Sequence, residues 1–123
     1  MKIFPNLRLS LKGCIIKEDP RESHRPAEAV RIAAGIGGWK KTDVDILLRG
    51  KASYILFPYA DEFVDGENYE HYLPLIREWK RPVYLAADAE KFKELEESET
   101  IYEWCDKARE ASLIQAASFQ IPF

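Results

Sequence analysis

The sequence predicts an α/β fold, a three-layer α/β/α sandwich in which helices cover both faces of a mainly parallel sheet of about five strands. Short apolar runs typical of strands alternate along the chain with segments of helical periodicity. Residues 44–48 read V-D-I-L-L, a nearly continuous apolar run of the kind found in a central strand covered on both faces. The chain has 123 residues and shows neither an internal repeat nor a linker, so we expect a single domain spanning 1–123.

The first half of the chain predicts one βαβ unit. A strand is expected at 11–17, a helix at 26–37 and a second strand at 43–49, joined by a right-handed crossover. The helix carries small and branched apolar residues on one broad face, which suits close packing on a sheet. It is expected to end at the segment 35–38, G-I-G-G, because glycine readily adopts the left-handed backbone conformation at which helices stop.

Three further helices are expected in the second half. The first lies at 69–80, and its regular part should begin only near Leu73 because Pro74 disfavours a preceding helical turn. The second is predicted for 89–97, with Asp88 as its N-cap. The third is predicted from the capping box T-I-Y-E at the start of 100–108.

Two more strands complete the expected sheet. Residues 82–87 read P-V-Y-L-A-A and predict a third strand, and residues 118–123 predict a fourth. Pro122 has no backbone N–H to donate, so the last strand is expected to end there or to lie at an edge of the sheet.

Composition limits the classes of partner and the cellular location that are expected for this protein. The net charge is −3 and the pI about 5.5, with 18 basic and 21 acidic residues, so nothing favours binding to nucleic acid. No segment is long and apolar enough to span a bilayer, and the N-terminus lacks the apolar core of a signal peptide. Two cysteines do not make a disulfide framework. We therefore expect a cytoplasmic protein.

No motif for a cofactor or a metal is evident. The segment 35–38 has the glycines of a nucleotide-binding fingerprint, but it ends a helix, whereas a phosphate loop begins one. His24 and His71 are the two histidines, and no cluster has the spacing of metal ligands. The acidic segment 61–67 lacks the alternating acidic positions of a calcium loop. We expect neither cofactor nor metal.

Chemistry is expected at the carboxyl ends of the strands, where ligands bind in open parallel sheets. Basic residues follow the first and second predicted strands, close to the expected N-termini of helices, and this arrangement favours an anion. The candidates for ligand binding are His24, Arg25, Arg49, Lys51 and Asp88. The alternative is that Glu18, Asp19 and Glu22 simply pair with the neighbouring bases in a solvated loop.

The two cysteines are weak candidates for catalysis. Cys105 lies on the apolar stripe of the helix predicted at 100–108, and Cys14 lies inside the first strand. Lys107 and Arg109 would lower the pKa of the Cys105 thiol only if that thiol were exposed. Both cysteines are interpreted first as small core residues.

The chain resembles the DsrE/DsrF-like proteins of the sulfur-relay group. The resemblance rests on the helix A-E-A-V-R-I-A-A-G-I-G, the strand end L-L-R-G-K-A-S-Y, and a closing helix with A-R-E-A before a terminal strand. It implies a five-stranded, mainly parallel sheet and assembly into dimers, trimers or hexamers, which the solution mass by light scattering would test. The fifth strand would be a short piece near 99–101 or 2–4.

The sequence departs from that family at the residue that matters for sulfur transfer. Sulfur-carrying members place a cysteine just after the third main strand, where this chain has Leu85-Ala86-Ala87-Asp88. The leading hypothesis is therefore a non-catalytic, oligomeric DsrE-like protein that binds a small anionic or sulfur-containing ligand. The alternatives are a sulfurtransferase or persulfide carrier using Cys105 or Cys14, and a phosphoacceptor-like domain with Glu18 and Asp19 as its acidic pocket.

Overall fold

The computed structural model describes residues 12–39, 44–58, 62–116 and 119–122. Within these ranges the chain alternates strands with α-helices and short 3-10 helices (η). In chain order the elements are β1 (Lys12–Ile16), α2 (Arg25–Trp39), β2 (Val44–Leu48), η1 (Gly50–Leu56), α3 (Gly66–Arg77), β3 (Val83–Leu85), η3 (Lys93–Glu97), β4 (Tyr102–Trp104), α4 (Lys107–Ala116) and β5 (Phe119–Pro122).

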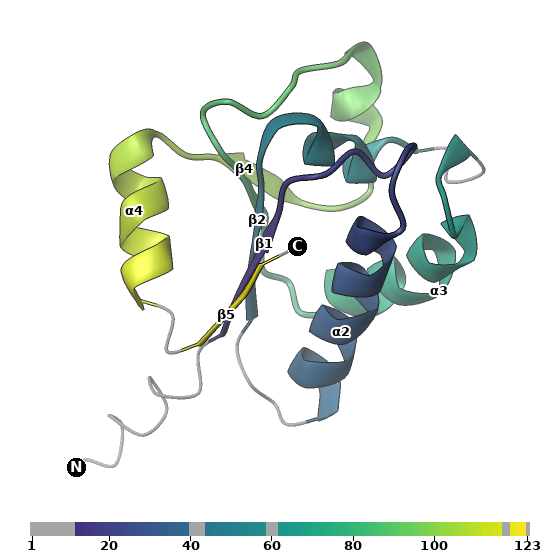
Figure 1. Ribbon diagram of the computed structural model, residues 1–123, viewed down its shortest axis with the longest axis horizontal. Coiled ribbons are helices and arrows are strands. Elements are labelled where there is room, and N and C mark those ends of the chain that lie inside the picture. The colour runs from purple at the N-terminus through teal and green to yellow at the C-terminus, as the bar shows by residue number, and fades with distance from the viewer. Residues whose placement is uncertain (1–11, 40–43, 59–61, 117–118, 123) are drawn as a thin grey trace.

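The strands form one parallel sheet in the order β4-β3-β2-β1-β5. From β1 to β4 the chain advances in one direction across the sheet, and right-handed crossovers therefore place α2 and α3 on the same face. The connection from β4 to β5 runs back across the sheet, so α4 lies on the opposite face (Figure 1). The predicted three-layer α/β/α sandwich is confirmed, and β5 is an edge strand as Pro122 indicated.

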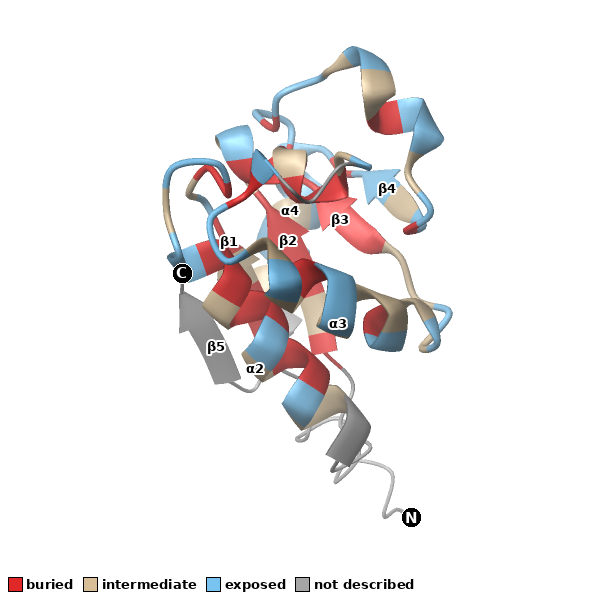
Figure 2. Ribbon diagram, turned by 90° about the vertical axis from the view of Figure 1, so that its right-hand side faces the viewer, coloured by how far each residue is buried: buried red, intermediate tan, exposed pale blue. Residues whose placement is uncertain are grey.

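The core is divided by the sheet. The larger apolar cluster lies between the sheet and the helices α2 and α3, and it includes Ile16, Leu48 and Ile76, each at most 2% exposed. A smaller cluster lies on the α4 side, where Leu113 and Ile114 of α4 pack against buried residues of the sheet. Strands β2 and β3 are buried through most of their length (Figure 2), as expected of strands covered on both faces.

The helix expected at 26–37 is confirmed, but α2 passes through the glycine segment and continues to Trp39, two residues further than expected. Gly35 and Gly37 do not have positive φ angles, so neither uses the freedom that would stop the helix. Gly37 instead lies directly beneath the indole ring of Trp79, where a Cβ atom would overlap that ring. Its small size serves the contact between α2 and α3.

The helix α3 also begins earlier than expected, at Gly66, and contains Pro74 in its interior. A proline there removes one intrahelical hydrogen bond, which costs about 3 kcal/mol in an isolated helix. Tyr69 and Ile76 are buried on the same helix, and this packing offsets the loss.

The helices predicted at 89–97 and 100–108 are wrong. The first segment contains only η3, and the second contains the strand β4. Strand β4 pairs in parallel with β3, and the Cys105 N–H then donates to the Leu85 carbonyl at 2.9 Å, so sheet pairing overrides the local capping signal. This is the fifth strand, placed directly after the 99–101 segment; the alternative at 2–4 lies outside the described residues.

Among the described residues, no helix has the length and apolar character needed to cross a membrane.

Candidate functional site

Successive strands end in register at one edge of the sheet. The first residue after β2 donates its N–H to the last carbonyl of β1, from Arg49 to Ile16, at 2.9 Å. The same 2.9 Å bond joins Ala86 to Leu48 and Cys105 to Leu85. Neighbouring backbone carbonyls therefore fix the start of each connecting loop, and side chains from three loops are presented along one row.

A pocket of about 410 Å³ opens at this edge, between the ends of β2 and β3 and the helix α4. We call it the edge pocket. Its lining consists of Arg49, Ala87, Asp88, Lys107, Glu110, Ala111 and Ile114. The volume falls within the range usual for small-molecule sites, and two basic and two acidic side chains give the lining no net charge.

Arg49 is held at the edge pocket by Glu110. Its Nε and Nη2 atoms donate to Glu110 Oε2 at 2.9 and 2.6 Å, and the side chains are 34% and 17% exposed. This half-buried pair orients the guanidinium group and offsets part of its charge. Lys107, in contrast, is exposed and forms no ion pair with any described residue.

Gly50 follows Arg49 in the chain and contacts Asp88 of the edge pocket, although it is not itself a lining residue. Its φ of 53° lies in the left-handed region and turns the chain from β2 into η1. The Gly50 N–H then faces Asp88 Oδ1 at 3.4 Å, while its carbonyl accepts from the Glu90 N–H at 2.9 Å. Asp88 caps no helix, contrary to expectation, because residues 89–92 are not helical. It ties the loops after β2 and β3 together instead.

The structure brings two of the five predicted ligand-binding residues together. Arg49 and Asp88 line the edge pocket, whereas Lys51 is an exposed residue of η1 outside its lining. His24 and Arg25 are exposed at the start of α2 and are likewise not lining residues. Arg25 lies 3.7 Å from Glu18, as the alternative of simple pairing predicted.

The acidic loop after β1 is held by its own arginine. Arg21 donates from its backbone N and Nε to Asp19 Oδ1 at 2.9 and 3.0 Å, and from Nη2 to Oδ2 at 2.7 Å. These hydrogen bonds hold the pKa of the Asp19 carboxyl below its usual range. The same guanidinium lies 3.9 Å from the centre of the Tyr54 ring in η1. Both Asp19 oxygens are thus used, and nothing here favours a phosphoacceptor.

Lys107 and Glu110 are the site residues that sequence reasoning missed. Both belong to α4, whose first turn is capped by Asp106 through the Arg109 N–H at 2.8 Å. The signal that could have found them is topological. A last helix that returns across the sheet must begin at the carboxyl edge, so its first turns face that edge.

Both cysteines are buried and free. Burial raises the pKa of the Cys14 thiol to about 12. The gap beside Cys14, between the sheet and α4, is only about 10 Å³, at or below what one water molecule needs. Cys105 is 7% exposed and its Sγ lies 3.4 Å from the Leu85 carbonyl. Burial, reinforced by Glu110, raises the pKa of its thiol as well.

Within the described part of the chain, no group of three or more His, Cys, Asp or Glu side chains is arranged to hold a metal ion.

A scan against protein-family models and a search of curated protein sequences each give no match. Among solved structures, the chain is similar to the crystal structure of ychN protein from E. coli, with a TM-score of 0.71 and 16% sequence identity. The similarity covers 91% of this chain and 97% of that one. That protein has a DsrE/DsrF-like fold, and the likeness shows that this chain has the same fold.

Proposed function

We propose that this chain is a non-catalytic DsrE-like binding protein that holds a small anion, such as sulfate or thiosulfate, in the edge pocket. The observation that carries the proposal is Arg49, whose guanidinium is fixed by Glu110 at the mouth of a pocket of about 410 Å³. Lys107 also lines the edge pocket and supplies a second positive charge. It forms no ion pair with any of the described residues. An anion would bind between the two.

The charge balance of the edge pocket predicts how tightly the anion binds. Glu110 competes with the ligand for Arg49 and repels it, so the affinity should be modest. Arg25 and Lys51 contribute at most a diffuse positive potential, because they do not line the pocket, and His24 lies outside its lining as well. The burial of both thiols argues against chemistry through either cysteine.

The first prediction follows from this competition. Lys107→Gln should weaken sulfate or thiosulfate binding about tenfold, the effect of one lost charge-assisted contact. Glu110→Gln should strengthen it about threefold to tenfold, because it removes the competing negative charge while the glutamine carbonyl can still accept a hydrogen bond from Arg49. Calorimetric titration of each anion, with chemical shifts of the α4 amides as a site monitor, measures both effects.

Lys51→Gln is the matched control, since it removes an equivalent charge just outside the edge pocket. It should change the affinity less than twofold. Binding that Glu110→Gln and Lys107→Gln leave unchanged would contradict the proposal, as would the absence of any heat or shift in the unaltered protein.

The position of Cys105 favours a second candidate, a persulfide carrier. Cys105 directly follows β4, so it lies at the carboxyl edge one strand away from the Leu85–Asp88 segment. As a thiolate, its sulfur would attack the outer sulfur of a donor persulfide, forming a new S–S bond and releasing the donor thiolate. Its burial and raised pKa oppose this reaction.

Thiol reactivity separates the two candidates. In the folded protein near pH 7.5 we expect iodoacetamide to label neither cysteine appreciably. The pKa of about 12 leaves Cys14 with roughly a thousandfold less thiolate than an unfolded cysteine. Peptide mass mapping of folded and urea-unfolded samples gives the two rates. Rapid labelling of Cys105 in the folded protein would support the persulfide carrier against the binding protein.

A further inference from the structure

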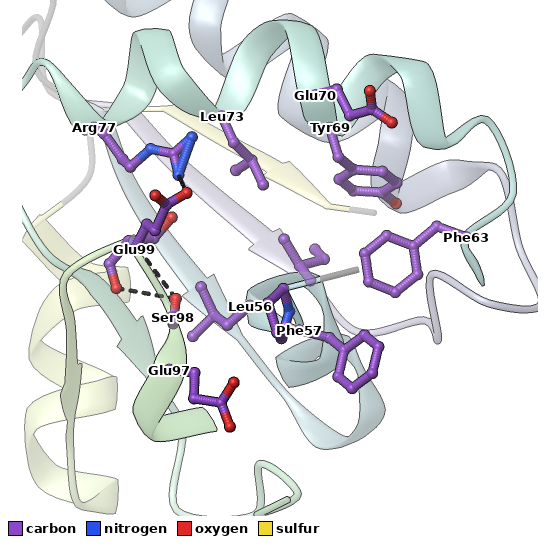
Figure 3. A pocket seen from close by; sticks show the side chains of 13 residues that line it. Leu56, Phe57, Phe63, Tyr69, Glu70, Leu73, Arg77, Glu97, Ser98 and Glu99 are labelled. Atoms are coloured by element: carbon purple, nitrogen blue, oxygen red, sulfur yellow. Dashed lines mark hydrogen bonds and ion pairs between the residues drawn. The ribbon is translucent and has the colours of Figure 1, made fainter. Parts of the chain in front are cut away.

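A larger pocket lies on the other side of the sheet from α4. It has a volume of about 480 Å³ and runs alongside α3, between that helix, the end of η1 and the segment from η3 to β4. We call it the α3 pocket. In Figure 3, Arg77 and Glu99 lie at one end and Phe57, Phe63 and Tyr69 at the other.

One wall of the α3 pocket is apolar. Leu56, Phe63 and Tyr69 are each at most 7% exposed, and Leu73 of α3 adds a half-buried aliphatic side chain. The aromatic rings form a continuous cluster. Phe63 meets Tyr69 edge-to-face with centroids 5.0 Å apart, and Phe57 lies 6.4 Å from Phe63. This wall accommodates a ring or a branched alkyl group.

The rim of the α3 pocket is acidic. Three glutamates line it, Glu70, Glu97 and Glu99, and all three are exposed. Arg77 is the one cationic side chain among the described lining residues, and its Nη1 donates to Glu99 Oε1 at 3.3 Å. Two carboxylates therefore remain without a cationic partner in the lining, and the potential at the mouth favours a cation.

A polar atom at the aromatic end has no partner. Tyr69 is 1% exposed, and its hydroxyl group forms no hydrogen bond with the described residues. Leaving such a group unsatisfied costs about 1–3 kcal/mol. Burial raises the pKa of this phenol, so it stays a neutral hydroxyl that can both donate and accept.

We propose that the α3 pocket binds a small arylalkylammonium ion, with its aryl group against the aromatic wall and its ammonium group at the glutamate rim. An aryl body uses the buried apolar surface, and face or edge contacts with the rings add to it. The ammonium group is attracted by the negative potential of the rim, to which Glu70 contributes from α3 and Glu97 from η3. An aryl carboxylate of the same size would meet that rim with the wrong sign.

This site is separate from the edge pocket. The two share no lining residue, and they lie on opposite sides of the sheet. The preferred charge is also opposite, so the failure of one proposal leaves the other standing.

The test compares three probes that differ mainly in charge: 3-phenylpropylammonium, 3-phenylpropan-1-ol and 3-phenylpropionate. Backbone amide shifts of the full chain are followed by NMR during each titration. We expect saturable shifts at the α3 pocket amides below about 10 mM for the cation, with an affinity about tenfold above that for the anion. The alcohol should lie between them.

Glu70→Gln/Glu97→Gln should reduce the affinity for 3-phenylpropylammonium about tenfold, because it neutralises the two rim carboxylates that Arg77 does not bond. Both positions are exposed, so the variant should fold normally. Glu22→Gln, an exposed carboxylate outside the pocket, should change the affinity less than twofold. Equal affinities for cation and anion, shifts outside the α3 pocket, or no saturation would each overturn the proposal.

Discussion

Replacing Gly37 with alanine should lower the free energy of unfolding by about 1–3 kcal/mol, the usual cost of overfilling a packed contact. In an exposed helix interior the same change would be stabilising. At Gly37 the added methyl group would overlap the indole of Trp79, which packs across α2 just beyond the end of α3. Either the ring must rotate away or the two helices must separate.

Gly35→Ala is the matched control. Gly35 lies two residues earlier in the same helix, is exposed, and has nothing within 4 Å of an added Cβ atom. Its replacement should raise the free energy of unfolding by about 0.5–1 kcal/mol, the helix propensity difference. Urea unfolding followed by circular dichroism measures both variants. If both were stabilised equally, Gly37 would not be a packing glycine, and the account of its contact with Trp79 would be wrong.

The glycines show why a sequence predicts elements better than their ends. The apolar stripe of α2 and the strand V-D-I-L-L follow from periodicity, which is a local property. The packing role of Gly37 depends instead on Trp79, more than forty positions later and just beyond the end of another helix. Glycine is the local signal both for the end of a helix and for close packing between elements. Which of the two applies depends on the residue that packs against it, here Trp79.

The helix predicted at 100–108 is wrong for a related reason, because a distant neighbour overrides a local signal. T-I-Y-E has a complete capping box, yet residues 102–104 are extended because β3 offers an unpaired edge beside them. Cys105 is predicted to lie on a helix face, but in the structure it directly follows a strand at the carboxyl edge of the sheet. The wrong secondary-structure prediction thus concealed that Cys105 lies at the carboxyl edge of the sheet.

The sequence predicts two charged residues of the edge pocket, Arg49 and Asp88, but not the two from α4. Arg49 follows an apolar strand in the chain, and strand ends meet at one edge, so its place could be inferred. Glu110, its partner, lies 61 positions further on and reaches Arg49 only because α4 crosses back over the sheet. The sequence alone therefore overstates the positive charge that Arg49 offers to an anion, because it does not reveal the ion pair with Glu110.

Replacing Asp19 with asparagine should destabilise the protein by about 1–2 kcal/mol at pH 7. Asp19 is 8% exposed and accepts three hydrogen bonds from Arg21, one from the backbone and two from the side chain. Hydrogen bonds to a charged partner contribute about 1.5–3 kcal/mol, and solvent screening lowers that contribution here because Arg21 is 37% exposed. The variant would also loosen Arg21 from Tyr54, and with it the contact between the β1 loop and η1.

The pH dependence gives this prediction its sign. Hydrogen bonds from Arg21 depress the folded pKa of Asp19, so the stabilisation is fully present above the unfolded value of about 4 and disappears as the pH falls through the lower folded value. The stability difference between the unaltered protein and Asp19→Asn should therefore be constant from pH 5 to 7 and shrink below about pH 4. Urea unfolding at a series of pH values measures it. Glu62→Gln, an exposed carboxylate, should show no such difference at any pH. If the stability difference between the unaltered protein and Asp19→Asn were as large at the lowest pH as at pH 7, the carboxylate charge would not be what holds this loop.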